Sequence, residues 1–485
     1  MLFNSLQFLV FFPLVVILYY LLPYKKRWIL LLLSSYYFYM SWNPAYIVLI
    51  LISTFVDYFA AIKMSEQKTK KKRRKYLFFS LLANLGLLFI FKYFNFFNDS
   101  VKLFFESIGL NYGVSSLNLL LPVGISFYTF QTLSYTIDVY KGITKPERHF
   151  GIFAVYVSFF PQLVAGPIER SERLLPQFHK QVIANENNFS SGMKLMVWGF
   201  FKKVVVADNV AVIVNHVYNN VNNFKGLPLI IATFLFAIQI YCDFSGYSDI
   251  AIGSARIMGI DLMKNFNTPY FAKSISEFWK RWHISLSTWF RDYVYIPLGG
   301  NRVSKGRHYL NLFLTFLISG LWHGANWTFV VWGALHGSFI VVESAFTDVF
   351  KKRKKKKSNF ILNLLKMIFT FMLVNFTWIF FRANNLKDAF YIISNLFSGV
   401  SDQIKTFGSL EKALSITGFT NYLIFVLFFC IIILLIYDAC IENHKIPKKK
   451  LVYNKYSRFF GIYILTMLIL VLGNYGSSEF IYFQF

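Results

Sequence analysis

The sequence WILLLLSSYYFYMSWNPAYIVLILISTFVDYFAAI, which runs from Trp28 to Ile62, decides the fold class of this chain. Asp57 is its only charged residue. A helix needs about 20 apolar residues to cross the hydrocarbon core of a bilayer, so this stretch is long enough for two such helices. Because proline removes a helical hydrogen bond, Asn43-Pro44 is the predicted break between them.

The composition of the whole chain agrees with this interpretation. Of its 485 residues, 56% are hydrophobic, 20% aromatic and 15% charged. A disordered chain has low hydrophobicity, and a soluble globular protein has about 25% charged residues. We therefore predict an all-α polytopic membrane protein with about eleven or twelve transmembrane helices, together with short re-entrant or interfacial helices. The apolar segments cover residues 1–24, 28–62, 76–97, 117–139, 150–164, 193–217, 228–258, 309–342, 363–381, 422–437 and 460–472.

Three basic clusters orient the predicted spans. They are Lys68 to Lys75, Lys351 to Lys357, and Lys445 with residues 448–450. Cytoplasmic loops are rich in Lys and Arg, and a topology that places all three clusters in the cytoplasm puts the N-terminus outside. The same topology puts the loop from Ala383 to Asn421 and the tail after Gly473 outside.

The basic clusters and the first apolar segment each have a second interpretation. A basic run is also typical of nucleic-acid binding, but these runs lie between apolar spans. We therefore predict contact with the lipid bilayer through anionic headgroups, and no nucleic-acid partner. A secretory signal has its positive charges first, whereas Lys25, Lys26 and Arg27 follow the first segment, so we predict a retained helix. The three cysteines have no metal-binding spacing, and no metal site is predicted.

The segment EFWKRWHISLSTWFRDYVYIPLGGNR, from Glu277 to Arg302, mixes charges with aromatic residues at every turn. This pattern indicates an interfacial amphipathic helix rather than a spanning one, and Pro297 with Gly299-Gly300 is predicted to end it. Its bases suit an anionic, phosphate-bearing donor. The alternative is an interfacial anchor, in which Trp and Arg contact headgroups.

A second segment, LISGLWHGANWTFVVWGALHG from Leu317 to Gly337, places His323 in apolar surroundings. Burial favours a neutral imidazole, and a neutral imidazole can act as a general base near pH 7. We predict that role for His323, because His283 supplies a second histidine beside the same polar segment. For His336 we predict a packed, hydrogen-bonded contact between helices.

Two further polar groups interrupt apolar stretches. Asp243 lies in YCDFSGYSDIAIG, with Gln239 nearby. These side chains could hydrogen-bond a broken helix, bind substrate, orient a histidine, or form a proton or ion path as in a transporter. The run QLVAGPIER, from Gln162 to Arg170, is interpreted as a helix-ending turn at the cytoplasmic face.

The segments LVAGPIER, FWKRWHISLSTWFRDYVYIPLGGNR and GLWHGANWTFVVWGALHG together resemble the membrane-bound O-acyltransferase superfamily. Within it they are similar to the bacterial branch of alginate and peptidoglycan O-acetylation membrane proteins, a branch that includes the D-alanyl transfer protein of teichoic acid synthesis. The N-terminal LQFLVFFP and the C-terminal FIYFQF extend the resemblance over the whole chain. The resemblance implies a single domain over residues 1–485, with N-terminal helices 1–97, a catalytic core of about 121–337, and C-terminal helices 360–485.

The resemblance implies a catalytic role for His323 and a second polar site at His283, inside a ring of tilted helices with a central tunnel. It implies that acetyl-coenzyme A or another acyl thioester is the donor substrate, with no permanently bound cofactor. The implied partner is an extracytoplasmic acyltransferase of the SGNH type, the final acceptor is a surface polysaccharide, and the implied location is the bacterial cytoplasmic membrane. The candidate donor- and substrate-binding residues are Lys280, Arg281, Trp282, Arg291, Trp322, Asn326, Gln239 and Asp243.

Several alternatives stay open at the level of sequence. His323 could act as a general base or form an acyl-histidine intermediate. His283 could position the donor or acceptor, or stabilise a tetrahedral oxyanion. The transferred group could be D-alanyl instead of acetyl. Rivals from other classes are a transporter for a glycan or acyl carrier, and a non-catalytic scaffold.

Overall fold

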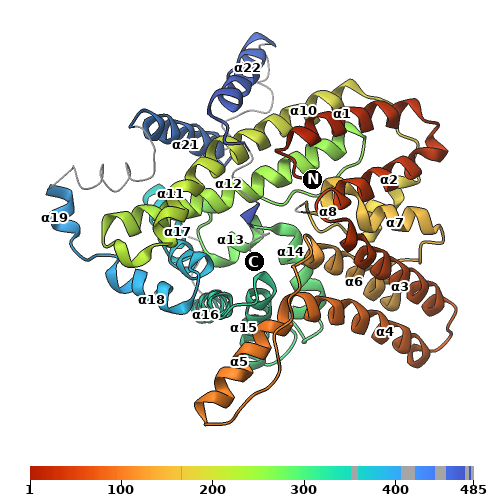
Figure 1. Ribbon diagram of the computed structural model, residues 1–485, viewed down its shortest axis with the longest axis horizontal. Helices are drawn as coiled ribbons and strands as arrows, with labels where there is room; N and C mark the ends of the chain where they lie inside the picture. Colours follow the sequence, from red (N-terminus) through yellow and green to blue (C-terminus); the bar gives the residue numbers. More distant parts are fainter. Residues whose placement is uncertain (165, 351–358, 406–420, 443–454, 476–479, 482–485) are drawn as a thin grey trace. The chain divides into compact units, whose positions relative to one another are not determined.

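A computed structural model of the chain describes residues 1–164, 166–350, 359–405, 421–442, 455–475 and 480–481 (Figure 1). The basic clusters at 351–357 and 445–450, part of the predicted outer loop and most of FIYFQF lie outside these residues. The described residues form helices and connecting loops, with no strand among them. The chain divides into two compact units, residues 1–196 with 248–263, and residues 197–247 with 264–485.

The first unit contains the N-terminal helices. Their bounds are α1 (Leu6–Leu21), α2 (Arg27–Met40), α3 (Ile47–Ser65), α4 (Lys70–Leu88), the π-helix η3 (Phe89–Tyr93), α5 (Phe94–Ser107), α6 (Ile125–Lys141), α7 (Phe150–Ser158), α8 (Phe160–Leu163) and α9 (Ser171–Phe178). The predicted break at Asn43-Pro44 is confirmed: α2 ends at Met40, and Asn43 caps a short 3-10 turn, η2 (Pro44–Tyr46).

The second unit contains the remaining helices. Their bounds are the π-helix η4 (Phe201–Ala207), α11 (Asp208–Tyr218), α13 (Ile275–Arg281), α14 (Ile284–Phe290), the π-helix η7 (Arg291–Tyr295), α15 (Lys305–His323), α16 (Trp327–Phe350), α17 (Phe360–Arg382), α18 (Leu386–Asn395), α19 (Val400–Lys405), α21 (Asn421–Glu442) and α22 (Lys455–Leu472). The boundary between the units falls within α10 (Glu186–Phe200) and α12 (Leu227–Ile257).

Six helices within the described residues are long and apolar enough to cross a membrane. They cover Pro44–Ser65, Lys70–Ser107, Leu227–Ile257, Trp327–Val349, Phe360–Arg382 and Ile424–Glu442. The predicted all-α polytopic membrane protein is thereby confirmed. The sequence-based number of spans is higher because it included shorter helices such as α1 and α6, and also α15, which begins with polar residues.

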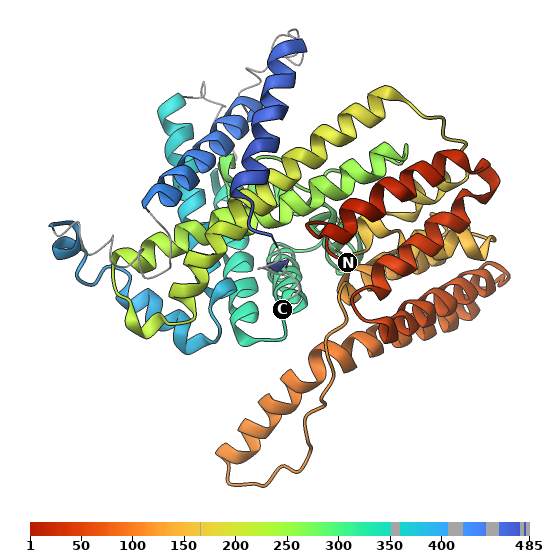
Figure 2. The ribbon, with the colours of Figure 1, turned by 45° about the horizontal axis from the view of Figure 1, so that its top comes forward.

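A buried carboxylate lies in the core of the first unit, where α3 and α4 pack side by side and both contact α6 (Figure 2). Asp57 is fully buried and accepts hydrogen bonds from Ser80 (2.5 Å), Asn84 (2.9 Å) and Thr136 (3.3 Å). A buried charged group is costly unless its oxygens are satisfied. The one charge of the stretch that decides the fold is therefore a structural centre of this unit.

Within the run QLVAGPIER, α8 ends at Leu163 and α9 begins directly after Arg170, so the predicted helix end is present. Its Glu169 is fully buried and accepts a hydrogen bond from the backbone N–H of Met263. Arg173 lies 3.9 Å from the same carboxylate and forms an ion pair of 2.6 Å with Asp261. Burial raises the pKa of Glu169 to about 7, against the lowering effects of the Met263 amide and of Arg173.

Because of this raised pKa, the free energy of unfolding is expected to fall as the pH rises. Below pH 4.5 the Glu169 carboxyl is protonated in both states, and between pH 4.5 and about 7 only the unfolded chain ionises. The loss at this one group is about 3 kcal/mol. Thermal unfolding in detergent at pH 5 and pH 8 measures it. Glu169→Gln should remove this part of the pH dependence, and an identical slope in the variant would contradict the assignment.

Candidate active site

The close packing of α15 against α16 positions His323. A Cβ atom on Gly333 would lie 2.5 Å from the carbonyl oxygen of Phe316, and Gly320 meets α16 just as tightly. Only glycine allows two helix backbones to approach so closely. His323 is the last residue of α15, and the chain leaves the helix at Gly324 in an extended conformation. The imidazole is thus held at the point where the two helices join.

Aromatic rings surround His323, which is only 3% exposed. The ring centroids of Trp322 and Trp332 lie 4.9 Å from that of the imidazole, and Phe381 on α17 lies at 5.4 Å. This apolar surrounding disfavours the imidazolium ion. The predicted burial of His323 is confirmed, and its surroundings suit a neutral base.

His283 lies between α13 and α14 in a backbone conformation that most residues avoid. Its φ is +43°, in the left-handed region, and its side chain is fully buried. The predicted single amphipathic helix from Glu277 is therefore interrupted here, and the structure has two short helices and the π-helix η7 instead. A strained conformation of this kind persists only where surrounding contacts hold it, and such positions concentrate at functional sites.

Asn265 supplies the contacts that hold His283. Its side-chain oxygen accepts hydrogen bonds from the backbone N–H of Ser285 (3.2 Å) and from the Ser285 hydroxyl (2.9 Å), and it lies 3.1 Å from Nδ1 of His283. The N–H of Ser285 can only donate, which identifies the Asn265 atom as the oxygen. The short contact with this oxygen favours the tautomer in which Nδ1 of His283 carries the proton and Nε2 the lone pair, and the Ser285 hydroxyl lies farther from Nδ1, at 3.4 Å.

The same burial affects the charge of His283. It lowers the pKa of the imidazole to about 3, so the ring is neutral at physiological pH. Phe244 on α12 packs edge-on against the ring, with centroids 4.5 Å apart. The site thus holds a neutral histidine of defined tautomer, with a basic nitrogen at Nε2.

Trp322 connects the two predicted histidines. Its ring centroid lies 4.9 Å from that of His323 and 6.3 Å from that of His283. The structure therefore brings His323 and His283 to one shared aromatic side chain, although 39 intervening residues separate them in the sequence.

His336 has a different environment from the other two histidines. It accepts a hydrogen bond from the indole N–H of Trp279 (3.2 Å) and lies 2.9 Å from the Thr377 hydroxyl. Both ring nitrogens are thus occupied within the protein. The predicted packed, hydrogen-bonded contact is confirmed.

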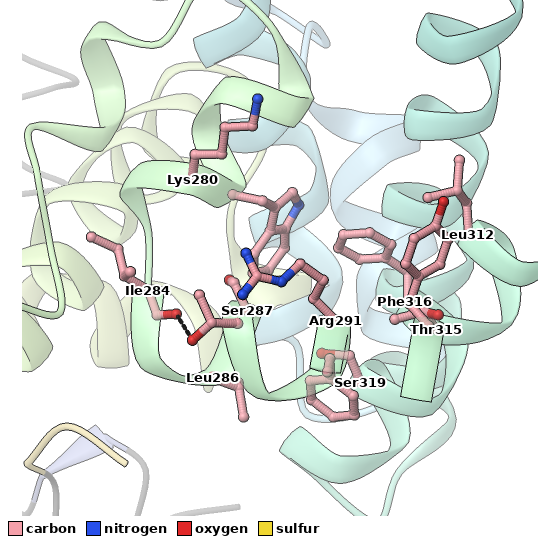
Figure 3. A pocket seen from close by; sticks show the side chains of 13 residues that line it. Lys280, Ile284, Leu286, Ser287, Arg291, Leu312, Thr315, Phe316 and Ser319 are labelled. Carbon is pink, nitrogen blue, oxygen red and sulfur yellow. Dashed lines mark hydrogen bonds between the residues drawn. The ribbon is translucent and has the colours of Figure 1, made fainter. Parts of the chain in front are cut away.

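A cavity of about 350 Å³ lies between α13, α14, η7 and α15 (Figure 3). Ile284, the residue after His283, and Ser319, one helical turn before His323, both line it. The guanidinium of Arg291 lies among the lining side chains, whereas the amine of Lys280 points away from them. The cavity is mostly apolar with cations at its edge, as expected for a site that binds a ligand with an apolar arm and an anionic end.

A second cavity of about 650 Å³ shares Tyr295 and Leu312 with the first. It is more polar, and its lining includes His308, Glu343 and Asp348. The carboxylate of Glu343 accepts a hydrogen bond from the backbone N–H of Ser276 (3.0 Å). Its two carboxylates outnumber the one lysine of its lining, Lys305, which lies 3.9 Å from Asp348, so this second cavity is less suitable for phosphates than the first.

Three other candidates make contacts within the protein. Arg281 forms ion pairs with Glu277 (2.6 Å) and Glu442 (2.5 Å). Trp282 is buried between aromatic rings. Asn326 caps the start of α16 through Thr328 N–H and donates to a backbone carbonyl. Geometry favours structural roles for these three, whereas Lys280 and Arg291 line a cavity.

The polar group on α12 also makes internal contacts. One carboxylate oxygen of Asp243 forms an ion pair of 2.7 Å with Lys203, and the other accepts a hydrogen bond of 2.8 Å from the backbone N–H of Ile481. Gln239 is 7% exposed on the same helix. Asp243 therefore fixes structure next to Phe244, which itself contacts His283.

Sequence reasoning missed Asn265, Ser285 and Lys203. Asn265 lies outside the quoted segments, and only the folded chain brings it to His283. Ser285 lies within the segment from Glu277 to Arg302, but nothing in the pattern marked it as a partner of Asn265. For Lys203 a signal was present, because two lysines interrupt an apolar stretch at Lys202-Lys203, and a charge at membrane depth indicates a buried partner.

Comparison with known protein families identifies the class of protein to which this site belongs. Residues 149–383 match the membrane-bound O-acyltransferase family, MBOAT, and this range includes both histidines and the first cavity. The chain belongs to this family and is an acyltransferase of the membrane.

Named relatives narrow the branch. The chain is 41% identical over 361 residues to the probable alginate O-acetylase AlgI of Pseudomonas aeruginosa, which covers 74% of this chain and 68% of that protein. It is 37% identical over 392 residues to the peptidoglycan O-acetyltransferase of Helicobacter pylori, covering 75% and 72%. It is 30% identical over 279 residues to the teichoic acid D-alanyltransferase of Bacillus subtilis, covering 55% and 70%. The chain therefore lies in the O-acetylation branch of the family.

Proposed function

We propose that this protein passes an acetyl group from a cytoplasmic thioester, acetyl-coenzyme A or a related carrier, across the membrane for O-acetylation of a cell-surface or secreted polysaccharide. An extracytoplasmic acyltransferase of the SGNH type receives the group and modifies the polysaccharide. The protein lies in the cytoplasmic membrane with its N-terminus outside and holds no permanent cofactor. The observation that carries the proposal is the pair of buried histidines that share Trp322 beside a cavity edged with cations.

The chemistry requires one proton transfer and one bond exchange. A neutral imidazole removes the proton from an acceptor hydroxyl, and the hydroxyl oxygen attacks the thioester carbonyl. The carbon–sulfur bond then breaks, and the thiol leaves with the proton that the imidazole returns. We assign the base to His323. Because its Nδ1–H points to Asn265, His283 offers a lone pair at Nε2, which favours positioning a hydroxyl over stabilising an oxyanion.

We assign the donor to the cavity in Figure 3. Its lining includes Ile284, the residue after His283, and Ser319, one helical turn before His323. Its apolar walls suit the arm that carries the thioester. Arg291 suits the phosphates, because a guanidinium binds phosphate oxygens bidentately. Arg291 also lies 2.8 Å from its neighbour Asp292, but its side chain is 60% exposed, and an exposed pair of this kind contributes little.

Arg291 and Arg281 should therefore differ in their effect on donor binding. Arg291→Ala is expected to raise the donor KM about tenfold, the loss of one charge-assisted contact of roughly 1.5 kcal/mol. Arg281→Ala, the matched control, breaks the ion pairs to Glu277 and Glu442 and should lower thermal stability without changing the donor KM. Coenzyme A release by purified protein measures the donor KM of each variant. A raised KM for the Arg281 variant alone would reverse the assignment.

One experiment separates the proposed transferase from its rivals. Purified protein is incubated with acetyl-coenzyme A labelled in the acetyl group. A transferase releases coenzyme A or becomes labelled, whereas a transporter or a scaffold does neither.

The same incubation with a D-alanyl carrier thioester tests the second candidate function, D-alanyl transfer, which the 30% identity to a D-alanyltransferase supports. Faster turnover of the D-alanyl thioester would replace acetyl by D-alanyl.

A further inference from the structure

A buried charge cluster in the second unit has no place in the proposed chemistry. Lys203, on the π-helix η4, lies 2.8 Å from a carboxylate oxygen of Asp208 and 2.7 Å from one of Asp243. The three side chains are at most 4% exposed. Buried ions are costly unless all of them are paired. The free-energy cost of burying two carboxylates with one lysine indicates that this cluster has a specific structural or functional role.

The cluster holds a segment that is distant in sequence. The second carboxylate oxygen of Asp243 accepts the backbone N–H of Ile481, and Ile481 is 2% exposed. A nearby part of the chain is held at η4 as well, since Asn474 N–H donates to the carbonyl of Val204 (2.9 Å). The main-chain N–H of Ile481 and the ring of Phe480 thus both contact α12, close to the end of the chain in Figure 1.

Phe480 links this docked segment to the site. It is fully buried, and its ring lies 4.7 Å from Tyr247 and 5.6 Å from Phe244, between centroids. Phe244 in turn packs at 4.5 Å against His283. The imidazole of His283 therefore contacts a ring that itself packs against Phe480. Asp243 and Phe244 are neighbours on α12, so one turn of helix carries both the anchor and the ring.

We propose that Lys203 and Asp243 are positioning residues that dock Phe480–Ile481 as a wall of the His283 site. This inference rests on the proposed function, because it assigns His283 to the acyl-transfer site. Asp243 divides its two oxygens between Lys203 and the Ile481 amide. The Asp208 side chain also pairs with Lys203 at 2.8 Å, whereas the backbone N–H of Ile481 is bonded to Asp243, so Asp208 supplies a matched comparison within the same ion cluster.

The docking of Phe480–Ile481 can be measured without an activity assay. In a background with Cys440→Ser, we place a cysteine by Ile481→Cys and follow its reaction with a maleimide in purified protein. We expect slow labelling with the intact cluster, at least tenfold faster labelling after Asp243→Ala, and little change after Asp208→Ala. Equal acceleration by both substitutions would show that the cluster stabilises the fold generally, and would overturn the anchoring role.

The link to function is tested with Phe480→Ala, which leaves every ion of the cluster in place. We expect acetyl transfer to fall at least tenfold with an unchanged donor KM, and Phe480→Leu, which keeps most of the volume, to restore much of it. Full activity of Phe480→Ala would overturn the positioning role. A failure of the proposed function gives a different result: the unmodified protein would then release no coenzyme A, while the labelling at position 481 still reports the docking.

Discussion

Replacement of His323 by alanine is expected to abolish acetylation. A general base contributes about 10²- to 10⁴-fold to a rate, and the His323 ring lies 4.9 Å from both Trp322 and Trp332 at the centre of the proposed site. The acetyl ester content of the surface polysaccharide is measured in a host that lacks its own enzyme, with the amount of protein in the membrane determined in parallel. Acetyl-coenzyme A turnover by purified protein should fall by the same factor.

His336 supplies the matched control for this experiment. It lies on α16, is as buried as His323, and also contacts Trp332. His336→Gln removes ring contacts and disturbs hydrogen bonds to Trp279 and Thr377, so it should lower stability by about 1–3 kcal/mol. We expect it to retain acetylation wherever the protein accumulates. Normal acetylation by His323→Ala at a normal protein level would end the catalytic assignment.

The sequence predicts the parts of this protein that depend on local patterns. The spans follow from apolar length, the break after Met40 follows from Asn43-Pro44, and His323 stands out as an ionisable side chain among apolar neighbours. These signals need no knowledge of distant contacts, because solvation and backbone chemistry act residue by residue. The helical class and the burial of His323 could therefore be predicted.

The supporting contacts could not be predicted in the same way. The amphipathic pattern from Glu277 to Arg302 is continuous, yet the chain turns at His283 because Asn265 accepts hydrogen bonds from the turn that follows. Arg281 and Arg291 look equivalent in sequence. Only the folded chain brings Glu442, from a helix far along the sequence, to the first of them. A side chain's partners decide whether its charge is available, and these partners are set by tertiary structure.

Asn265 is where such a contact should matter most for activity. Asn265→Leu removes the oxygen that receives Nδ1–H of His283, so the imidazole can adopt the other tautomer and lose its basic Nε2. We expect a loss of about a hundredfold in acetyl transfer, within the range up to ~10⁴-fold that a wrong histidine tautomer costs a catalytic site. Coenzyme A release by purified protein measures this loss, provided that thermal unfolding shows the variant to be as stable as the unmodified protein. Ser285→Ala, which removes only one donor to the same oxygen, should cost a few-fold at most.

A pH profile separates this role from a purely structural one. Asn265→Asp keeps the acceptor oxygen but places a negative charge beside His283, which raises the pKa of the imidazole from its low value of about 3. Protonation then removes the basic nitrogen at higher pH, so the acidic limb of the rate profile should move upward while activity at pH 8 is kept. If Asn265 only supported the fold, the variant would lose activity equally at every pH, and the limb would stay where it is in the unmodified protein.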